Sequence, residues 1–237
     1  MGDYSNMASY YDVIMTSGYY DYAKIVDNLD LQDNVEKVLE IGCGTGLILE
    51  ELARRKSSIQ ISGIDLTEPM LAIAKERLKS FKNVALFQQN VCHMSLPSAH
   101  DLAFSYGGVW YFVIDGDKEP FLVSHIPDHG ANLQGIEKMA QYIVPHGTLL
   151  LGIQGPHHNY ETVISNGMKY SQKIDPTDIG FTKHYYLSDG TQTLMAQTVK
   201  YRTYNFEKAK NMLSAHGFAY VPESRDSKLF LRFSRAS

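Results

Sequence analysis

The chain has 237 residues, enough for one well-buried core with additions but too few for two full catalytic domains. Its 22 Lys and Arg against 26 Asp and Glu give a net charge of −4. Because binding to a phosphate backbone requires a basic surface, we expect no nucleic-acid partner. The two cysteines, Cys43 and Cys92, exclude a disulfide scaffold and favour a reducing, cytoplasmic location.

The N-terminal segment and the longest apolar run both argue against export and membrane insertion. No Lys or Arg precedes Lys24, and the segment has no unbroken apolar stretch, so it is not a secretory signal. The run 102–114 is interrupted by Ser105, Gly107 and Gly108 and is shorter than the roughly 20 residues that a membrane helix needs. We therefore expect a soluble protein without a membrane partner.

The first half of the chain predicts a helical cap followed by an α/β core. Residues 1–34 are rich in tyrosine and predict two short helices. From residue 35, apolar strands alternate with amphipathic helices, which is typical of a parallel sheet. The predicted strands here are 38–41, 59–64, 84–87, 102–104 and 148–153, and the predicted helices are 47–55, 67–80 and 136–142.

The alternation of strands and helices stops after Gln154 and resumes near residue 206. Two β-like runs, 183–187 and 193–204, flank Ser188-Asp189-Gly190, which is a strong hairpin signal. A helix at 206–216 and strands at 218–221 and 229–233 then complete a doubly wound, seven-stranded Rossmann-like sheet. The predicted parts are a cap (1–34), a core (35–154 and 205–237) and an inserted substrate-binding lid with a β-hairpin after the fifth strand (155–204).

A glycine-rich turn joins the first predicted strand of the core to its first helix. Glycine at positions 42, 44 and 46 permits positive φ and lets a ligand approach the backbone at the positive end of the helix. Asp65 ends the next strand about 20 residues on, where a carboxylate can accept both ribose hydroxyls. The glycine spacing departs from the dinucleotide fingerprint, which disfavours NAD, and the sequence has no P-loop. A purely structural turn is the alternative, but Asp65 at the end of the next strand favours a nucleotide-like cofactor.

The pattern Glu40-x-Gly42-x-Gly44-x-Gly46, together with Asp65 and with Asn90-Val91 after the third strand, resembles class I methyltransferases that depend on S-adenosylmethionine (SAM). The resemblance covers roughly residues 35–155 and, more loosely, 205–234. It implies SAM as the cofactor. The residues that it assigns to cofactor binding are Tyr11, Glu40, Gly42, Cys43, Gly44, Gly46, Asp65, Leu66, Met70, Asn90, Val91 and Ser105.

Within this set the resemblance implies particular contacts. Asp65 would bind the ribose diol, and Leu66 and Met70 would enclose the adenine. Asn90 stands where the family commonly has Asp, and its amide oxygen can still accept a hydrogen bond from the adenine amino group. Tyr11 belongs to a Tyr-Asp pair that resembles the N-terminal pair of small-molecule members, whose Tyr reaches the cofactor; a surface aromatic is the alternative.

Candidate contacts to the methyl acceptor come from aromatic residues in the cap and after the fourth strand. Methyl transfer mainly requires alignment of the acceptor and exclusion of water, which aromatic walls provide. These residues do not form the Asn/Asp-Pro-Pro-aromatic motif of methylases that act on adenine or glutamine amides. Packing in the core is the alternative for part of this cluster. The candidates are Tyr19, Tyr106, Trp110 and Tyr111.

Histidines supply the candidate catalytic bases. His157 and His158 directly follow the fifth strand, and a pKa near neutral lets such a side chain accept a proton; two solvated loop histidines are the alternative. His125 and His129 flank Pro127, which opposes a helix that would present both imidazoles to a metal. We expect no metal site.

An acidic chain with a tyrosine-rich cap suits a compact, partly apolar acceptor. The N-terminal Tyr-Asp helix and the hairpin insertion resemble small-molecule N-methyltransferases, which implies that the acceptor atom is an amine nitrogen. Two alternatives remain open: a small-molecule O-methyltransferase with a His base, and a non-catalytic SAM-binding regulatory or interaction module. We expect a monomer or a homodimer.

Overall fold

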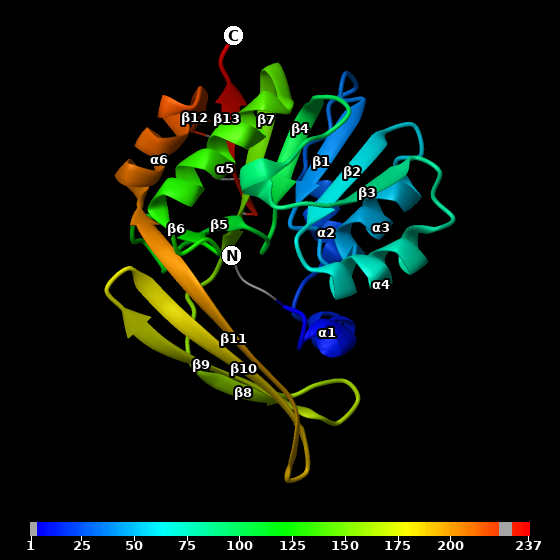
Figure 1. The fold of residues 1–237 in the computed structure, drawn as a ribbon, viewed down its shortest axis with the longest axis vertical. Helices are drawn as coiled ribbons and strands as arrows, with labels where there is room; N and C mark the ends of the chain where they lie inside the picture. Colours follow the sequence, from blue (N-terminus) through cyan, green and yellow to red (C-terminus); the bar gives the residue numbers. More distant parts are fainter. Residues whose placement is uncertain (1–3, 223–228) are drawn as a thin grey trace.

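The computed structural model describes residues 4–222 and 229–237 (Figure 1). In this part of the chain, thirteen strands form one connected sheet in the order β3-β2-β1-β4-β7-β5-β6-β11-β10-β9-β8, with β13 paired to β7 and β12 to β13. The sequence predicted seven strands, so the structure corrects that number. The additional strands are short or polar and belong to the lid and its attachment.

The parallel part of the sheet forms the core of the molecule. Val38, Leu39 and Ile41 are buried, because a parallel strand is covered by helices on both faces. The strands are β1 (Lys37–Ile41), β2 (Gln60–Asp65), β3 (Val84–Gln88), β4 (His100–Ser105) and β7 (Ile143–Gln154). Each lies within a few residues of its predicted position except β7, which starts five residues before the predicted 148.

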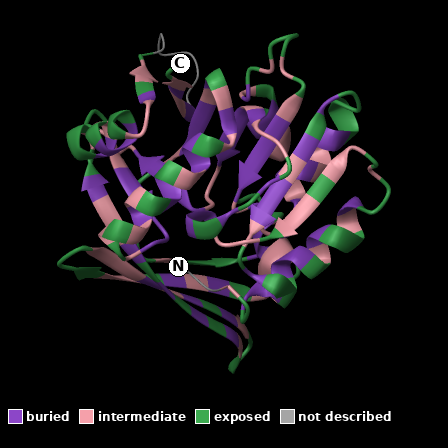
Figure 2. Cartoon of the chain, turned by 45° about the horizontal axis from the view of Figure 1, so that its top comes forward, coloured by how far each residue is buried: buried purple, intermediate pink, exposed green. Residues whose placement is uncertain are grey.

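Helices cover the two faces of this sheet, and Figure 2 shows the buried strands between them. One apolar cluster joins β1 and β4 to α2, α3 and α4, and a second joins the opposite face to α5 and α6. On α3, buried Ile48, Leu49 and Leu52 recur at helical spacing and pack on the sheet. The bounds are α2 (Tyr22–Asp27), α3 (Leu47–Arg55), α4 (Glu68–Leu78), the short 3-10 helix η1 (Val91–His93), α5 (His129–Gln141) and α6 (Phe206–Ala215).

The lid is a continuation of the same sheet. Strand β5 pairs with the end of β7 and with β6, and β6 pairs with β11, so the lid strands extend below the core in Figure 1. The predicted hairpin is confirmed: Asp189 pairs with Gln192 across the turn. The bounds are β5 (Trp110–Val113), β6 (Phe121–Ser124), β8 (Tyr160–Val163), β9 (Lys169–Thr177), β10 (Gly180–Asp189) and β11 (Gln192–Asn205).

The lid buries one face, as the period of two in a strand requires. Tyr185 and Leu187 of β10 and Tyr201 of β11 are buried in an apolar cluster with Ile14 and Met15 of α1 (Ala8–Met15). The two cap helices predicted from the sequence are α1 and α2. Helix α1 therefore packs against the lid, and in Figure 1 it lies below α4 and beside the lid strands.

The C-terminal strands β12 (Phe218–Val221) and β13 (Phe230–Arg235) lie at the predicted positions. They are antiparallel and complete the edge of the core. None of the helices within residues 4–222 and 229–237 is long and apolar enough to cross a membrane.

Candidate functional site

The glycine-rich turn between β1 and α3 has an exposed backbone because three of its residues have no side chain. Gly42, Gly44 and Gly46 have φ of 79°, 53° and 80°, a region that favours glycine. A Cβ on Gly42 would lie 3.0 Å from the Gly108 Cα, and one on Gly44 would lie 3.9 Å from the Tyr11 ring. The amide of Gly42 donates to the Ile64 carbonyl at 2.9 Å, which ties the turn to the end of β2.

Asp65, at the end of β2, is fixed beside this turn. Its Oδ2 accepts from the Gly44 amide at 2.9 Å, and its Oδ1 accepts from the Thr67 amide at 2.8 Å. Burial raises the pKa of Asp65, and the two amide hydrogen bonds oppose this rise by favouring the carboxylate. Each oxygen has a further lone pair, so Asp65 is a preoriented acceptor for a pair of hydroxyl groups.

Helix α1 is fastened to the turn by polar contacts. The Thr45 hydroxyl donates to Asp12 Oδ1 at 2.6 Å. Arg77 of α4 pairs with Asp12, donates to the Thr45 carbonyl at 2.9 Å, and contacts Glu50 Oε2 at 2.9 Å. These contacts hold Tyr11, the neighbour of Asp12, over Gly44.

The turn, the cap and the lid enclose one cavity of about 940 Å³, including the part that is open to solvent. The carboxyl ends of the core strands form one end of the cavity, here called the cofactor end after the residues that the resemblance assigned to SAM. The inner face of the lid forms the other end, here called the lid end. The residues that line it are Tyr4, Met7, Tyr11, Met15, Tyr19, Tyr20, Gly42, Gly44, Ile64, Asp65, Leu66, Thr67, Met70, Gln89, Val91, Gly107, Gly108, Val109, Tyr111, His125, Gln154, Tyr170, Lys183, Tyr185 and Tyr201.

Most residues that the resemblance assigned to the cofactor lie on this cavity. They combine polar backbone and a carboxylate with an apolar pair, Leu66 and Met70, which matches the ribose and the adenine of SAM in chemical character. The residues present therefore fit this cofactor. The predicted residues that line the cavity are Tyr11, Gly42, Gly44, Asp65, Leu66, Met70 and Val91; those that do not are Glu40, Cys43, Gly46, Asn90 and Ser105.

The residues away from the cavity support the turn or the core. The Asn90 side chain caps η1 by accepting from the Cys92 amide at 2.9 Å, and the neighbouring Gln89 lines the cavity instead. A Cβ on Gly46 would lie 2.9 Å from Leu78 Cδ1, so this glycine lets α4 pack closely. Glu40 is buried behind the turn, and burial together with the charge of Asp65 raises its pKa well above the usual value.

Two of the four residues predicted to contact the acceptor line the cavity, and two do not. Tyr19 and Tyr111 line the cavity, whereas Tyr106 packs against the rings of Tyr20 and Phe230 at 5.2 and 5.3 Å. Trp110, predicted to contact the acceptor, is instead 1% exposed in the apolar core. Its indole N–H donates to Asn132 Oδ1 at 2.8 Å, so this side chain has a structural partner and does not reach the cavity.

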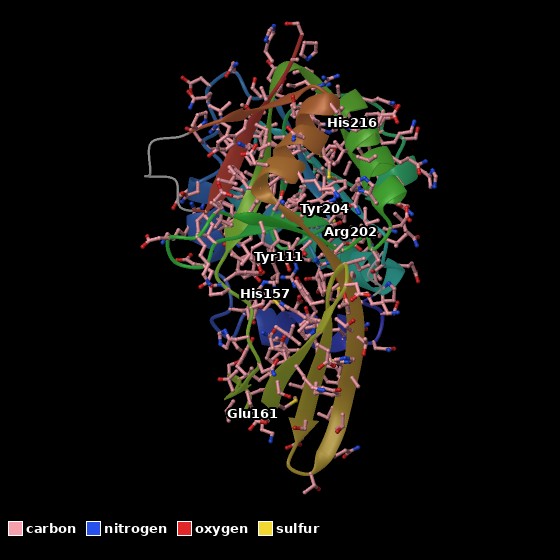
Figure 3. All side chains as sticks on the ribbon, turned by 90° about the vertical axis from the view of Figure 1, so that its left-hand side faces the viewer. Tyr111, His157, Glu161, Arg202, Tyr204 and His216 are labelled. Atoms are coloured by element: carbon pink, nitrogen blue, oxygen red, sulfur yellow. The ribbon has the colours of Figure 1, made fainter. Side chains whose placement is uncertain are left out.

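The two candidate bases occupy different environments. His158 is exposed, and His157 lies below Tyr111 where the core meets the lid (Figure 3), with ring centroids 5.6 Å apart. His157 Nε2 contacts Gln154 Oε1 at 3.2 Å, which assigns the N–H to Nε2. Burial and the nearby charge of Lys183 lower the pKa of His157 to about 3, and neither histidine lines the cavity.

The sequence did not identify several polar groups at the lid end of the cavity. Lys183 of β10 is 3% exposed, and burial lowers its pKa to about 7. His125, after β6, lies on the same wall, and burial followed by the charge of Lys183 lowers its pKa to about 3. A period-two count from Tyr185 and Leu187 places Lys183 on the inner face, so a signal for it was present. Within the described ranges, no group of three His, Cys, Asp or Glu residues could hold a metal ion.

Comparison with known proteins finds sequence similarity in the N-terminal half of the chain. Residues 38–124 match the methyltransferase domain family. Over 78 residues, a third (33%) of this chain, the sequence is 37% identical to ribosomal RNA small subunit methyltransferase A of Persephonella marina. Over 69 residues (29% of the chain) it is 35% identical to malonyl-[acyl-carrier protein] O-methyltransferase of Bacillus anthracis. These matches span only 29% and 25% of the two relatives.

The fold extends further than the sequence similarity. The SAM-bound structure of CalS10, an amino pentose methyltransferase from Micromonospora echinaspora, superposes with a TM-score of 0.67 and 17% identity. The superposition covers 95% of this chain and 96% of CalS10, so the lid is part of the shared fold. Residues 38–124 therefore match the methyltransferase domain family, and nearly the whole chain shares the fold of a SAM-bound methyltransferase.

Proposed function

We propose that this chain transfers the methyl group of SAM to the amine nitrogen of a small molecule bound between the glycine-rich turn and the lid. The observation that carries this proposal is the single cavity whose lining includes both Asp65 at the cofactor end and Tyr111 at the lid end. A cofactor and an acceptor bound in one enclosed space can be aligned away from water, which is what methyl transfer requires.

When bound, SAM supplies an electrophilic methyl group on a positively charged sulfur. The residues of this chain contribute binding and alignment: Asp65 would hold the ribose, and Tyr19 and Tyr111 would form walls for the acceptor. Asp12 and Arg77 would keep the cap helix closed over the turn. The enclosed cavity and the net charge of −4 both support a small acceptor rather than a nucleic acid.

The environment of the histidines supports an amine acceptor. A neutral amine attacks without a base on the enzyme, whereas an alcohol needs a positioned base during attack. The pKa of His157 is lowered to about 3 by burial and by Lys183, so this imidazole is a weak base. The similarity to CalS10 supports an amino-bearing acceptor, and the similarity to an O-methyltransferase keeps oxygen as the second candidate.

The test uses SAM with a deuterated methyl group and a panel of small amines matched with the corresponding alcohols. Mass spectrometry locates the label, and Asp65→Ala serves as the cofactor-binding control. We expect labelled N-methyl products with the amines and no product with the alcohols. Label on oxygen would favour the O-methyltransferase, and tight binding of S-adenosylhomocysteine (SAH) without any product would favour a non-catalytic binding module.

A further inference from the structure

Lys183 is a buried lysine, and none of the described residues that line its end of the cavity is acidic. Its side chain is 3% exposed and lines the cavity from the inner face of β10. None of the ion pairs among the described residues includes it. Its Nζ instead lies 5.9, 5.9 and 5.8 Å from the ring centroids of Phe181, Tyr185 and Tyr201. Aromatic rings stabilise a cation only partly, so the ammonium group lacks a full counterpart.

Hydroxyl groups beside Lys183 also have unused hydrogens. The Tyr201 hydroxyl lies 2.7 Å from that of Tyr4 and 2.7 Å from that of Tyr185. Three hydroxyls contain three hydrogens, and two hydrogen bonds between them use only two, so one donor remains whichever way the bonds run. The hydroxyl of Tyr170, which is 1% exposed, is buried without a hydrogen-bond partner in the described part of the chain. Hydroxyl donors therefore lie beside Lys183 at this end of the cavity.

A carboxylate matches an ammonium group with hydroxyl donors beside it. It supplies one negative charge for the one cation, and its two oxygens accept several hydrogen bonds in one plane. A phosphate monoester has about two charges at neutral pH and is less well matched by a single lysine. We propose that Lys183, together with the tyrosine hydroxyls of the lid, binds a carboxylate group of the acceptor, so that the substrates of this protein are amines that also carry a carboxylate.

The proposal rests on the proposed function in identifying the ligand as the acceptor, but carboxylate binding is measured without methyl transfer. The probes are aromatic and aliphatic carboxylic acids, each paired with its primary amide and its phosphonate. They are titrated in the presence of saturating SAH and followed by thermal unfolding and calorimetry. Binding of SAH itself is recorded first, so that failure of the cofactor assignment is separated from failure of the carboxylate site.

Two variants with the same substitution make the comparison specific. Lys183→Met keeps most of the length of the side chain and removes the charge, whereas Lys200→Met removes an exposed lysine from the outer face of β11. We expect acids to bind the wild type and Lys200→Met about tenfold or more tightly than their amides, and this preference to disappear in Lys183→Met. Unchanged SAH binding in all three proteins establishes that each variant is folded.

The pH dependence supplies a second readout. The titratable groups that face Lys183 are His125, His157, Tyr185 and Tyr201. Burial and Lys183 lower the pKa of both histidines to about 3, and burial raises those of the tyrosines well above 10, so only Lys183, at about 7, titrates near neutrality. Binding of an acid above neutral pH should therefore take up a proton, seen as a buffer-dependent heat.

Three results would overturn the carboxylate site: equal binding of acids and amides by the wild type, an acid preference that persists in Lys183→Met, or tighter binding of phosphonates than of acids. A kcat loss in Lys183→Met without any change in acid binding would instead make this lysine a base.

Discussion

The cofactor end and the lid end of the cavity differ in what holds their functional groups. At the cofactor end, Asp65 is fixed by two backbone amides, and the turn is fixed by backbone bonds to β2. At the lid end, the groups are side chains on the inner face of antiparallel strands, held by packing and by hydroxyl contacts between Tyr4, Tyr185 and Tyr201. Backbone geometry suits one constant ligand, whereas side chains on a strand are easily exchanged, which suits variable acceptors.

The largest expected difference between the two ends is the response of stability to pH. The unfolded chain keeps the Lys183 proton up to about pH 10.5, whereas the folded chain loses it near 7. The unfolded state therefore binds more protons between these values, and the free energy of unfolding rises with pH there by at most about 1.4 kcal/mol per unit. His125 and His157, with folded pKa values of about 3 against 6.5, add a loss of stability as pH falls below 6.5.

Urea unfolding at about pH 5, 7 and 9 measures this response. Lys183→Met should flatten the rise from pH 7 to 9, and Lys200→Met should keep it. Hydrogen exchange should place the acid sensitivity in β9–β11 rather than in β1–β4. Parallel stability curves for the wild type and Lys183→Met would contradict a buried, unpaired lysine.

A second contrast comes from the cofactor end. Asp65→Ala should weaken SAH binding by about 1.5 to 3 kcal/mol, the range for losing hydrogen bonds to a charged group. Calorimetry measures this loss, with Asp189→Ala at the tip of the lid hairpin as the control. An SAH affinity within a few tenths of a kcal/mol of the wild type would place the ribose elsewhere.

The third contrast concerns the hydrogen-bonded hydroxyls of Tyr4, Tyr201 and Tyr185, and its expected free-energy change is similar or smaller. Tyr201→Phe leaves the hydroxyls of Tyr4 and Tyr185 without their shared partner and should cost about 1 to 3 kcal/mol of stability with unchanged SAH affinity. Tyr186→Phe is the matched control, because Tyr186 is 39% exposed on the outer face of β10. Equal effects of the two substitutions on denaturant unfolding would remove the distinction between the faces of the lid.

The smallest expected effect concerns His157. A catalytic base typically contributes 10²- to 10⁴-fold to a rate, so His157→Ala should lower kcat by less than about tenfold if the acceptor is an amine. His158→Ala, at an exposed position, should have less effect still. Steady-state kinetics with the best amine substrate from the panel measures both. A fall of about a thousandfold at His157, with normal SAH binding, would require a base and an oxygen acceptor.

Much of the core could be predicted from the sequence because its signals are local. The helix predicted at 47–55 has the bounds of α3, and the alternating glycines predicted the turn, since both depend on neighbouring residues. Strands β5 and β6 were missed because they lie in apolar or turn-rich stretches whose pairing partners, β7 and β11, are distant in sequence. Strand β8 was missed because it is mostly exposed and has no apolar face to recognise.

Candidate residues that the backbone positions lie on the cavity where the sequence placed them, whereas those that depend on tertiary packing do not. Asp65 follows from its place at the end of a strand, whereas Trp110 was misplaced because only the fold shows that its indole bonds to Asn132. Asn90 and Gln89 are adjacent, and the start of η1 decides which side chain faces the cavity. A lysine in a polar strand suggests solvent, so Lys183 could be placed only by its parity with Tyr185 and Leu187.

The central claim is that one cavity holds the cofactor at one end and the acceptor at the other. Steady-state kinetics with SAM and the best amine from the panel test it most directly, in Asp65→Ala and Tyr111→Leu. We predict a crossed pattern: Asp65→Ala raises KM for SAM about tenfold or more and leaves that of the amine within about twofold, and Tyr111→Leu does the reverse. If both substitutions raise the two KM values equally, the division of the cavity into two ends is contradicted.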